Sequence, residues 1–207
     1  MVRTVAVLAV VAVIALLGGM WFVSRDAGSD DQFAQCRIGA IAGGTSAIGG
    51  PFTLVSETGE TVTDKDVITE PSLLYFGYTF CPDVCPLDND RNAQAVSILE
   101  EKGTMVQPVF ISVDPARDTP EVMAEFTDVM HPRMLGLTGS LEQVKAASQA
   151  YRTYYKKQEG DDPEYYLMDH STFSYLVLPE HGFVEYFKRD VTPEQMADTI
   201  GCFVKNM

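Results

Sequence analysis

The chain has 207 residues, 46% of them hydrophobic, and a formal net charge of -14 at pH 7. This is the composition of an ordinary globular protein, and it excludes disordered, collagenous and repeat-array classes. Lysines and arginines are few and scattered, so no nucleic-acid partner is expected. Setting aside an apolar N-terminal segment and its linker leaves about 160 residues, a common size for one domain.

The N-terminal segment Thr4–Val23 is apolar and carries no charge. A helix of about 20 residues spans a hydrocarbon core of about 30 Å. The segment ends in large residues, including Trp21, which favours a retained anchor over a cleaved signal peptide. Residues 1–25 are therefore predicted to form one transmembrane helix. Because Arg3 and Arg25 flank both ends, charge does not fix its orientation.

The next segment, residues 26–50, is rich in Gly, Ser, Ala and Asp, which is the composition of a flexible linker. The folded domain is predicted over residues 51–207. It opens with Phe52–Val55 and Glu60–Thr63, which flank the turn Glu57–Gly59 and predict a short hairpin.

Two continuous apolar runs predict buried strands, Ser72–Tyr78 and Met105–Val113. Between them, Pro86–Glu101 carries apolar residues among polar ones and stops at Gly103. This pattern predicts an amphipathic helix. The first strand therefore leads directly into a helix, with a short cysteine-bearing segment between them.

Two more helices are predicted from their N-terminal signals. The first runs from Pro120 to Met130, with Thr119 as its N-cap and proline at the first helical position. The second is Leu141–Tyr151, capped by Ser140. The short segment Met134–Leu137 between them is typical of a strand.

The last part of the domain follows a polar segment, Lys156–Glu164. Phe173–Leu178 and Phe183–Phe187 flank the turn Pro179–Gly182 and predict a hairpin, and Thr192–Val204 predicts a closing helix. The alternation favours an α/β fold with a largely parallel sheet covered by helices. The final antiparallel hairpin fits the thioredoxin arrangement, in which helices flank a mixed sheet.

The cysteines Cys81 and Cys85 lie four residues apart, just after a predicted buried strand. Ligands of α/β sheets bind outside the carboxyl ends of strands. A neighbouring helix N-terminus would stabilise thiolate, making the pair reactive nucleophiles or metal ligands. A static disulfide closing so short a loop would add little stability. We therefore interpret the pair as redox-active or metal-binding.

The other two cysteines, Cys36 and Cys202, lie at the two ends of the domain. A bridge between them would close a long loop, which is typically worth about 2–4 kcal/mol. We interpret this pair as a structural disulfide, with two free thiols as the alternative.

Of the three histidines, His170 lies in a predicted loop before the closing hairpin. The residues alone leave it equally open to a structural role and to a ligand role. His131 follows a helix, where capping or dipole compensation is expected, and His181 lies in a solvated turn.

Two thiolates and one imidazole suit Cu(I), and can also hold Cu(II), better than they suit Mg²⁺ or Ca²⁺. A closed zinc site would need a fourth ligand. Candidates for that oxygen are Asp83, Asp88 and Asp169.

Four sequence motifs resemble the Sco/SenC proteins of respiratory-chain assembly. They are GYTFCPDVCP (77–86), SVDPARDTPE (112–121), HPRMLGLTG (131–139) and DHSTFSYLV (169–177). The motifs occur in the family's order and cover nearly the whole predicted domain. The resemblance implies a thioredoxin-like fold.

The resemblance also implies that Cys81, Cys85 and His170 bind copper, with Asp169 matching the family's acidic neighbour of the histidine. Family members deliver copper to the binuclear copper centre of cytochrome c oxidase, or keep the cysteines of that centre reduced. The implied partners are a copper-accepting oxidase subunit and an upstream copper donor. The implied location is the bacterial inner membrane, with a single pass and the domain in the periplasm.

Two functions from different classes therefore remain. One is a metallochaperone that needs no catalytic turnover. The other is a thiol:disulfide oxidoreductase, in which Cys81 or Cys85 attacks and the other resolves while His170 tunes thiolate character. Peroxide reduction is weaker, because no peroxide-activating arginine is evident near the cysteines.

Overall fold

The computed structural model describes residues 12–21, 31–39, 44–158 and 165–207. The chain divides into two units, Met1–Gln35 and Cys36–Met207. Residues 12–21 are helical. Within the four described ranges, no helix combines the length and apolarity needed to cross a bilayer. Half of the predicted span Thr4–Val23 lies outside these ranges, as do residues 26–30 and 40–43 of the predicted linker.

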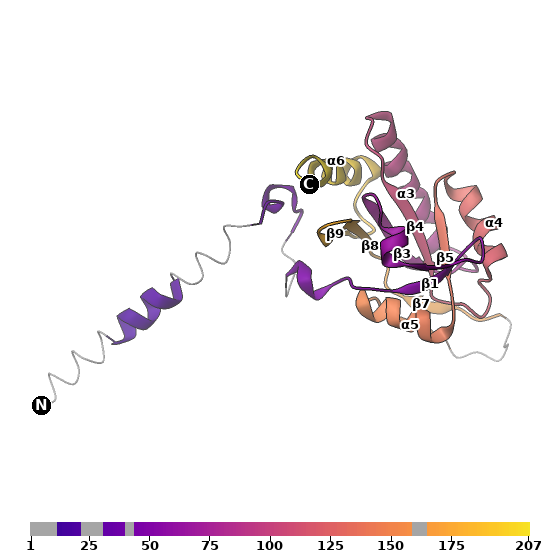
Figure 1. The fold of residues 1–207 in the computed structure, drawn as a ribbon, viewed down its shortest axis with the longest axis horizontal. Coiled ribbons are helices and arrows are strands. Elements are labelled where there is room, and N and C mark those ends of the chain that lie inside the picture. The colour runs from indigo at the N-terminus through magenta and orange to yellow at the C-terminus, as the bar shows by residue number, and fades with distance from the viewer. Residues whose placement is uncertain (1–11, 22–30, 40–43, 159–164) are drawn as a thin grey trace, which may run out of the picture. The chain divides into compact units, whose positions relative to one another are not determined.

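The unit Cys36–Met207 is built on a seven-stranded sheet with the order β2-β1-β5-β4-β3-β8-β9 (Figure 1). Its strands are β1 (Thr53–Ser56), β2 (Thr61–Thr63), β3 (Ser72–Gly77), β4 (Gln107–Ser112), β5 (Leu135–Thr138), β8 (Ser174–Leu178) and β9 (Gly182–Phe187). A separate two-stranded sheet consists of β6 (Tyr155–Lys157) and β7 (Met168–His170). Both predicted hairpins are confirmed, as β1–β2 and β8–β9.

The sheet is mixed, as predicted, but it is not largely parallel. Only β3–β4 and β4–β5 pair in parallel among the described strands. β1 pairs antiparallel with β5, and β8 pairs antiparallel with β3. The expectation was wrong because periodicity reports which face of a strand is buried and not its direction. The parallel trio places the carboxyl ends of β3 and β4 together.

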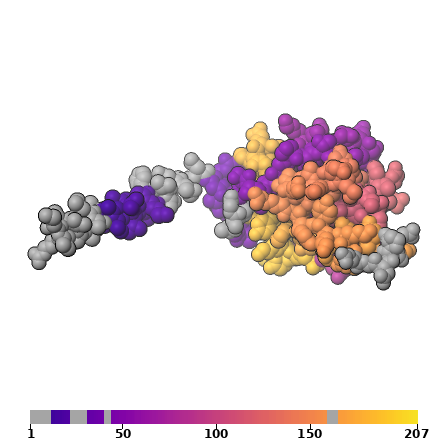
Figure 2. Space-filling model, turned by 90° about the horizontal axis from the view of Figure 1, so that it is seen from below, coloured from indigo at the N-terminus to yellow at the C-terminus, as the bar shows by residue number. Residues whose placement is uncertain are grey.

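Helices cover both faces of this sheet. They are α2 (Asp64–Val67), α3 (Val84–Glu101), α4 (Pro120–Met130), α5 (Leu141–Ala150) and α6 (Pro193–Lys205), with 3-10 turns η1 (Ala34–Cys36) and η2 (Thr45–Ala47). α3 packs against α6, while α5 lies on the opposite face, against β1 (Figure 1). The exposed side of α5 is seen in orange in the space-filling view (Figure 2).

The starts of α4 and α5 follow the predicted caps, and α6 starts at Pro193 with Thr192 as its N-cap. The Thr119 side chain accepts a hydrogen bond from a first-turn amide of α4. Ser140 and Thr192 form capping boxes with Gln143 and Gln195. Each such cap contributes about 1 kcal/mol. Capping therefore fixes the residue at which each of the three helices after β4, β5 and β9 begins.

The core is formed by the central strands and the rings that pack on them. Phe76 on β3 and Phe110 on β4 are fully buried, and Phe110 packs against the tilted ring of Phe126 of α4 at a centroid distance of 4.6 Å. Burying a side chain of this size contributes about 1.5–3 kcal/mol. The carboxyl ends of β3 and β4 are therefore rigidly supported.

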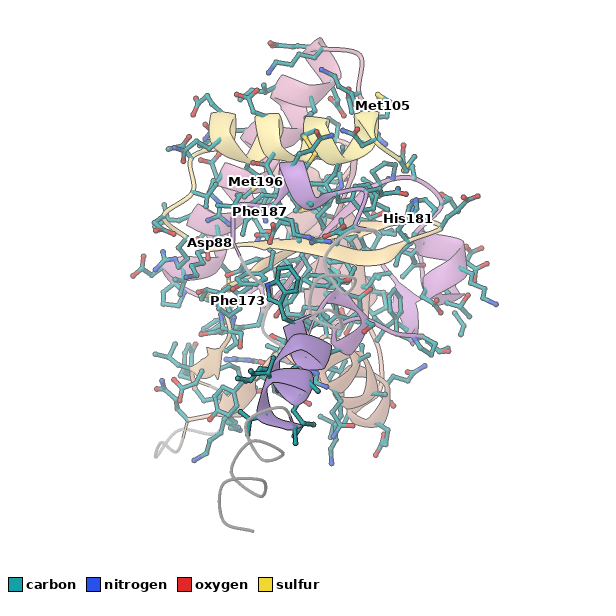
Figure 3. All side chains as sticks on the ribbon, turned by 90° about the vertical axis from the view of Figure 1, so that its left-hand side faces the viewer. Asp88, Met105, Phe173, His181, Phe187 and Met196 are labelled. Atoms are coloured by element: carbon teal, nitrogen blue, oxygen red, sulfur yellow. A yellow bond between two sulfur atoms is a disulfide. The ribbon has the colours of Figure 1, made fainter. Side chains whose placement is uncertain are left out.

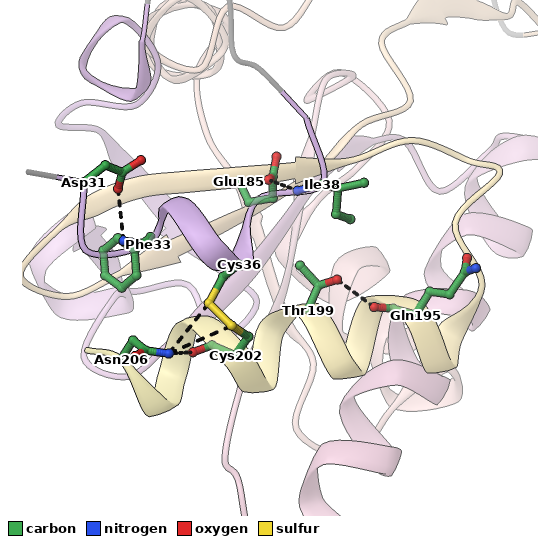
Figure 4. Close-up of a disulfide and its surroundings, with 9 residues drawn as sticks. All are labelled: Asp31, Phe33, Cys36, Ile38, Glu185, Gln195, Thr199, Cys202 and Asn206. Atoms are coloured by element: carbon green, nitrogen blue, oxygen red, sulfur yellow. Dashed lines mark hydrogen bonds between the residues drawn. A yellow bond between two sulfur atoms is a disulfide. The ribbon is translucent and has the colours of Figure 1, made fainter. Parts of the chain in front are cut away.

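A disulfide joins Cys36 to Cys202 of α6, across a sequence separation of 166 (Figure 4). The predicted pairing is confirmed. Asn206 donates to the Cys202 carbonyl at 2.9 Å. The Ile38 N–H donates to the buried Glu185 carboxylate at 3.2 Å, so the segment after Cys36 lies along β9.

Candidate metal centre

Cys81 and Cys85 lie where β3 ends and α3 begins. A tight turn follows the strand, and in it the Cys81 N–H donates to the Tyr78 carbonyl at 3.3 Å. α3 starts at Val84 rather than at the predicted Pro86, so Cys85 lies in its first turn. The predicted placement of the pair at the carboxyl end of a buried strand is correct.

The sulfur of Cys81 takes the place of a helix cap. Asp83, at the N-cap position, makes no side-chain capping bond. Instead, the Cys85 N–H donates to Cys81 Sγ at 3.3 Å. First-turn amides have no partner within the helix and bear a partial positive charge. The helix start therefore favours a thiolate at Cys81.

The two thiols are electrostatically unequal. The pKa of Cys81 is held well below its ordinary value, chiefly by a hydrogen bond from the Cys85 thiol, with His170 and first-turn amides adding to this and burial opposing it. The same hydrogen bond, followed by burial, raises the pKa of Cys85. Both cysteines are free in this structure. These opposite shifts favour a thiolate at Cys81 beside a thiol at Cys85.

Gly77 makes room for the buried sulfur. A Cβ at this position would lie 2.9 Å from the rings of Phe110 and Tyr75 and 3.0 Å from Cys85 Sγ. Contacts that short require the neighbours to shift. The fully buried position of Cys85 therefore depends on a glycine at the end of β3.

His170 is the last residue of β7, opposite Tyr155 of β6. The prediction that it lies in a loop was wrong, because a three-residue strand has no periodicity to read. Its Nδ1 lies 2.9 Å from the Ser171 carbonyl oxygen. A carbonyl only accepts, so Nδ1 is the donor in this contact, and Nε2 is the ring nitrogen left to face a metal. His170 Nε2 lies 3.3 Å from Cys85 Sγ.

The structure thus brings together all three predicted ligands. The sulfurs and one ring nitrogen of Cys81, Cys85 and His170 lie within 4.8 Å of one another. The rings of Tyr75 and Tyr78 stand edge-on to the imidazole, with centroid distances of 6.1 and 5.8 Å. Burial raises the pKa of Tyr78 to about 12, so its phenol stays neutral. The histidine ring is therefore held in place by its carbonyl partner and by aromatic walls.

The three candidate carboxylates are occupied elsewhere or remain outside the group. Asp88 accepts from the Tyr75 hydroxyl at 2.9 Å and pairs with Arg189 at 3.0 Å. Asp169 accepts from Gln158 at 2.6 Å. Among the described residues, the metal-binding group contains only two sulfurs and one nitrogen. This set suits Cu(I) and lacks the fourth ligand of a closed zinc site.

The other two histidines do not join the group. His131 is the C-cap of α4, as expected, and its buried Nδ1 accepts from the Arg133 N–H at 3.2 Å. Burial lowers its pKa. His181 lies exposed in the turn between β8 and β9, at the other end of that hairpin from Phe173 (Figure 3).

Sequence reasoning missed the residues that brace the site. Asp114 and Asp118, between β4 and α4, are both buried. Asp118 accepts hydrogen bonds from Thr79, and Asp114 accepts one from Tyr166. Both acids lie in the motif SVDPARDTPE, which indicated the family resemblance but assigned no role to either acid. Two acidic residues between a buried strand and a helix cap were the available signal.

Comparison with known proteins agrees with this geometry. The SCO1/SenC family model matches residues 41–205. Protein SenC of Rhodobacter capsulatus is 56% identical over 203 residues, which cover 98% of this chain and 90% of SenC. The mitochondrial SCO1 homolog 1 of Arabidopsis thaliana is 43% identical over 158 residues, covering 76% of this chain and 47% of that longer protein.

A solved structure adds the fold. The crystal structure of Arabidopsis thaliana ScoI with copper bound has a TM-score of 0.72 and 41% identity, covering 77% of this chain and 99% of that one. The two chains share a mixed α/β, thioredoxin-like fold with a central sheet and helices. With a family model over most of its length and a relative of this identity, the chain belongs to the SCO1/SenC family.

Proposed function

We propose that this protein is a copper metallochaperone that binds one copper ion through Cys81, Cys85 and His170. The observation that carries the proposal is the convergence of two sulfurs and one ring nitrogen within 4.8 Å of one another. The copper-bound relative, 41% identical to this chain, supports the choice of metal. The present protein passes its copper to a subunit of cytochrome c oxidase. There the copper becomes part of the binuclear copper centre of that enzyme.

The ligand set is suited to passing a metal on. Soft thiolates favour Cu(I), and a three-ligand site leaves the ion open to attack by the thiolates of an acceptor. His170 is half-buried, whereas the cysteines are buried. We infer that transfer proceeds by stepwise exchange in which His170 leaves early. No electron changes hands in that exchange, and an upstream donor reloads the site.

The alternative function is reduction of a disulfide in an exported protein, favoured by the thiolate at Cys81. Its sulfur attacks the target disulfide, forming a mixed disulfide and releasing one target thiolate. Cys85 then attacks Cys81, forming the Cys81–Cys85 disulfide and releasing the second target thiol. Two electrons pass to the target, and an external thiol must reduce the pair again.

We also propose a single-pass anchor at Thr4–Val23 in a bacterial inner membrane, with the folded unit in the periplasm. The charge-free apolar run in the sequence and the similarity to SenC of a bacterium support it. The Cys36–Cys202 disulfide also fits an oxidising compartment. An alkaline phosphatase fused after the last residue should be active, and alkaline washing should leave the chain in the membrane. An inactive fusion would reverse the proposed orientation.

The decisive experiment measures bound copper on the full chain in mild detergent, reduced and free of oxygen. We expect one Cu(I) per chain in the wild type, none retained by Cys81→Ser and strongly weakened retention in His170→Ala. His181→Ala is the matched control and should bind like the wild type. Disulfide reduction should survive His170→Ala. A wild type that retains no copper would leave the dithiol reductase as the function.

A further inference from the structure

We propose that the loop between β4 and α4, residues 113–119, positions the two halves of the copper site relative to each other. Asp118 holds the turn that carries Cys81, and Asp114 holds the segment that leads to His170. The assignment rests on the proposed function, since it concerns the same site. It adds residues that do not touch the metal and act through its ligands.

A positioning element is needed because the ligands come from different sheets. Cys81 follows β3 of the seven-stranded sheet, whereas His170 ends β7 of the two-stranded sheet. Among the described strands, no ladder of backbone hydrogen bonds joins these two sheets. The distance between sulfur and imidazole is therefore set by contacts between side chains and loops.

The loop contacts the cysteine-bearing turn through the carboxylate of Asp118, which is fully buried. It accepts from the Thr79 hydroxyl at 2.6 Å and from the Thr79 N–H at 3.2 Å. The Ser112 hydroxyl donates to it at 2.6 Å. Thr79 lies two residues before Cys81, in the turn that follows β3. A buried acceptor with three donors leaves this turn little freedom.

The loop contacts the segment that leads to His170 through the carboxylate of Asp114. The Tyr166 hydroxyl donates to it at 2.7 Å, and Arg117 Nε pairs with it at 2.5 Å. Tyr166 lies two residues before β7, the strand that ends in His170. This hydrogen bond therefore ties the histidine-bearing strand to the loop.

Arg117 contacts both the cysteine-bearing turn and the segment that leads to His170. Its guanidinium lies 3.6 Å from the centroid of the Tyr166 ring and 4.6 Å from that of Phe80. Phe80 precedes Cys81 directly, so one side chain contacts both halves of the site. The loop itself is fixed to the main sheet, because the Val113 N–H donates to the Gly77 carbonyl at 2.7 Å.

The test compares matched hydroxyl deletions in the full chain. Thr79→Val and Tyr166→Phe each remove one hydroxyl donor to this loop and keep the side-chain shape. Thr127→Val is the control, because that buried hydroxyl also donates to a carboxylate, Glu57 at 2.7 Å, but it lies in α4. Thr79→Ser keeps the hydroxyl and should restore wild-type behaviour.

Two readouts separate positioning from general stability. One is the sulfur-to-copper charge-transfer absorption and the hyperfine splitting of the Cu(II)-loaded protein. The other is the reduction potential of the Cys81–Cys85 pair without metal. Thr79→Val and Tyr166→Phe should alter the copper spectra and weaken Cu(I) binding about tenfold or more, the usual effect of losing an outer-shell partner. Thr79→Val should also shift the potential, whereas Thr127→Val should change neither readout.

The outcomes are distinguishable. Wild-type spectra, affinity and potential in both Thr79→Val and Tyr166→Phe would overturn the inference and leave the copper function standing. A wild type that binds no copper would rule out the copper function. The reduction potential of the Cys81–Cys85 pair would then be the one readout that tests the positioning role of the loop. A shift in Thr79→Val that is absent in Thr79→Ser and Thr127→Val supports positioning. Equal shifts in all three variants would reduce the effect to general loosening.

Discussion

The four cysteines form two pairs that share a residue type and differ in every other respect. Cys36 and Cys202 are 166 residues apart and bridged, whereas Cys81 and Cys85 are four apart and free. The long loop makes the first pair stabilising, and the helix start makes the second pair reactive. The comparison teaches that separation along the chain and the local backbone, rather than the thiol itself, assign a cysteine its role.

The largest expected effect concerns the reactivity of the free pair, Cys81 and Cys85. Because the pKa of Cys81 is lowered, its thiolate persists as the pH falls, while the raised pKa of Cys85 keeps that thiol protonated. An ordinary thiol of pKa about 8.5 is thiolate in only about one molecule in 3,000 at about pH 5. Iodoacetamide should therefore label Cys81 in the reduced, metal-free chain at about pH 5, read by peptide mass spectrometry.

The contrast between the two cysteines is the internal control of that labelling experiment. Cys85 should stay unlabelled under conditions in which Cys81 reacts fully. A labelling midpoint for Cys81 near the ordinary thiol value would contradict the sulfur-capped helix start as a source of thiolate.

The second prediction breaks the structural pair. Replacing Cys36 and Cys202 with serine should lower the free energy of unfolding by about 2–4 kcal/mol, because the unfolded chain regains the freedom of a long loop. Urea unfolding of the double variant measures this. Copper stoichiometry should stay at the wild-type value, and its loss would mean that the two pairs are coupled.

The third prediction concerns Gly77, next to the reactive pair. Gly77→Ala places a methyl group against two rings and Cys85 Sγ, which should cost about 1–3 kcal/mol through overpacking. Copper retention should fall as well, since Cys85 has to move. Thermal unfolding and metal analysis test both parts, and an alanine variant with unchanged copper binding would remove the role assigned to this glycine.

The smallest effect belongs to Gly201, which precedes Cys202 in α6. A Cβ there would lie 3.6 Å from Leu99 Cδ2, an ordinary contact. Gly201→Ala should therefore stabilise the protein by about 0.5–1 kcal/mol, because alanine loses less freedom in a helix. It is the matched control for Gly77→Ala, and destabilisation in urea would show that the disulfide end is as tightly packed as the metal site.

The sequence predicted what is written locally. Continuous apolar runs located β3 and β4, and hydroxyl caps located α4 and α5. The position of Cys81 at the end of a buried strand followed from the same runs. These signals depend on neighbours within a few residues, which is why they were readable.

What the sequence did not predict depends on distant partners. α3 begins before Pro86 because a sulfur acts as its cap, and cysteine is not among the residue types that signal a cap. Among the described strands β7 pairs with β6 alone, a partner that no local pattern shows, so His170 was placed in a loop. Asp118 bonds Thr79 from 39 residues away, a pairing that no local pattern encodes. Strand direction was likewise unreadable.

The bridge between Cys36 and Cys202 also has a mechanical consequence. Tension applied between the residues before Cys36 and those after Cys202 would pass through one covalent bond between two sulfurs. The copper ligands, the sheet and the β4–α4 loop all lie within the closed loop and outside that line of force. A pull along the chain would leave them unloaded until the bond is reduced, when the same force would begin to peel the domain apart from its ends.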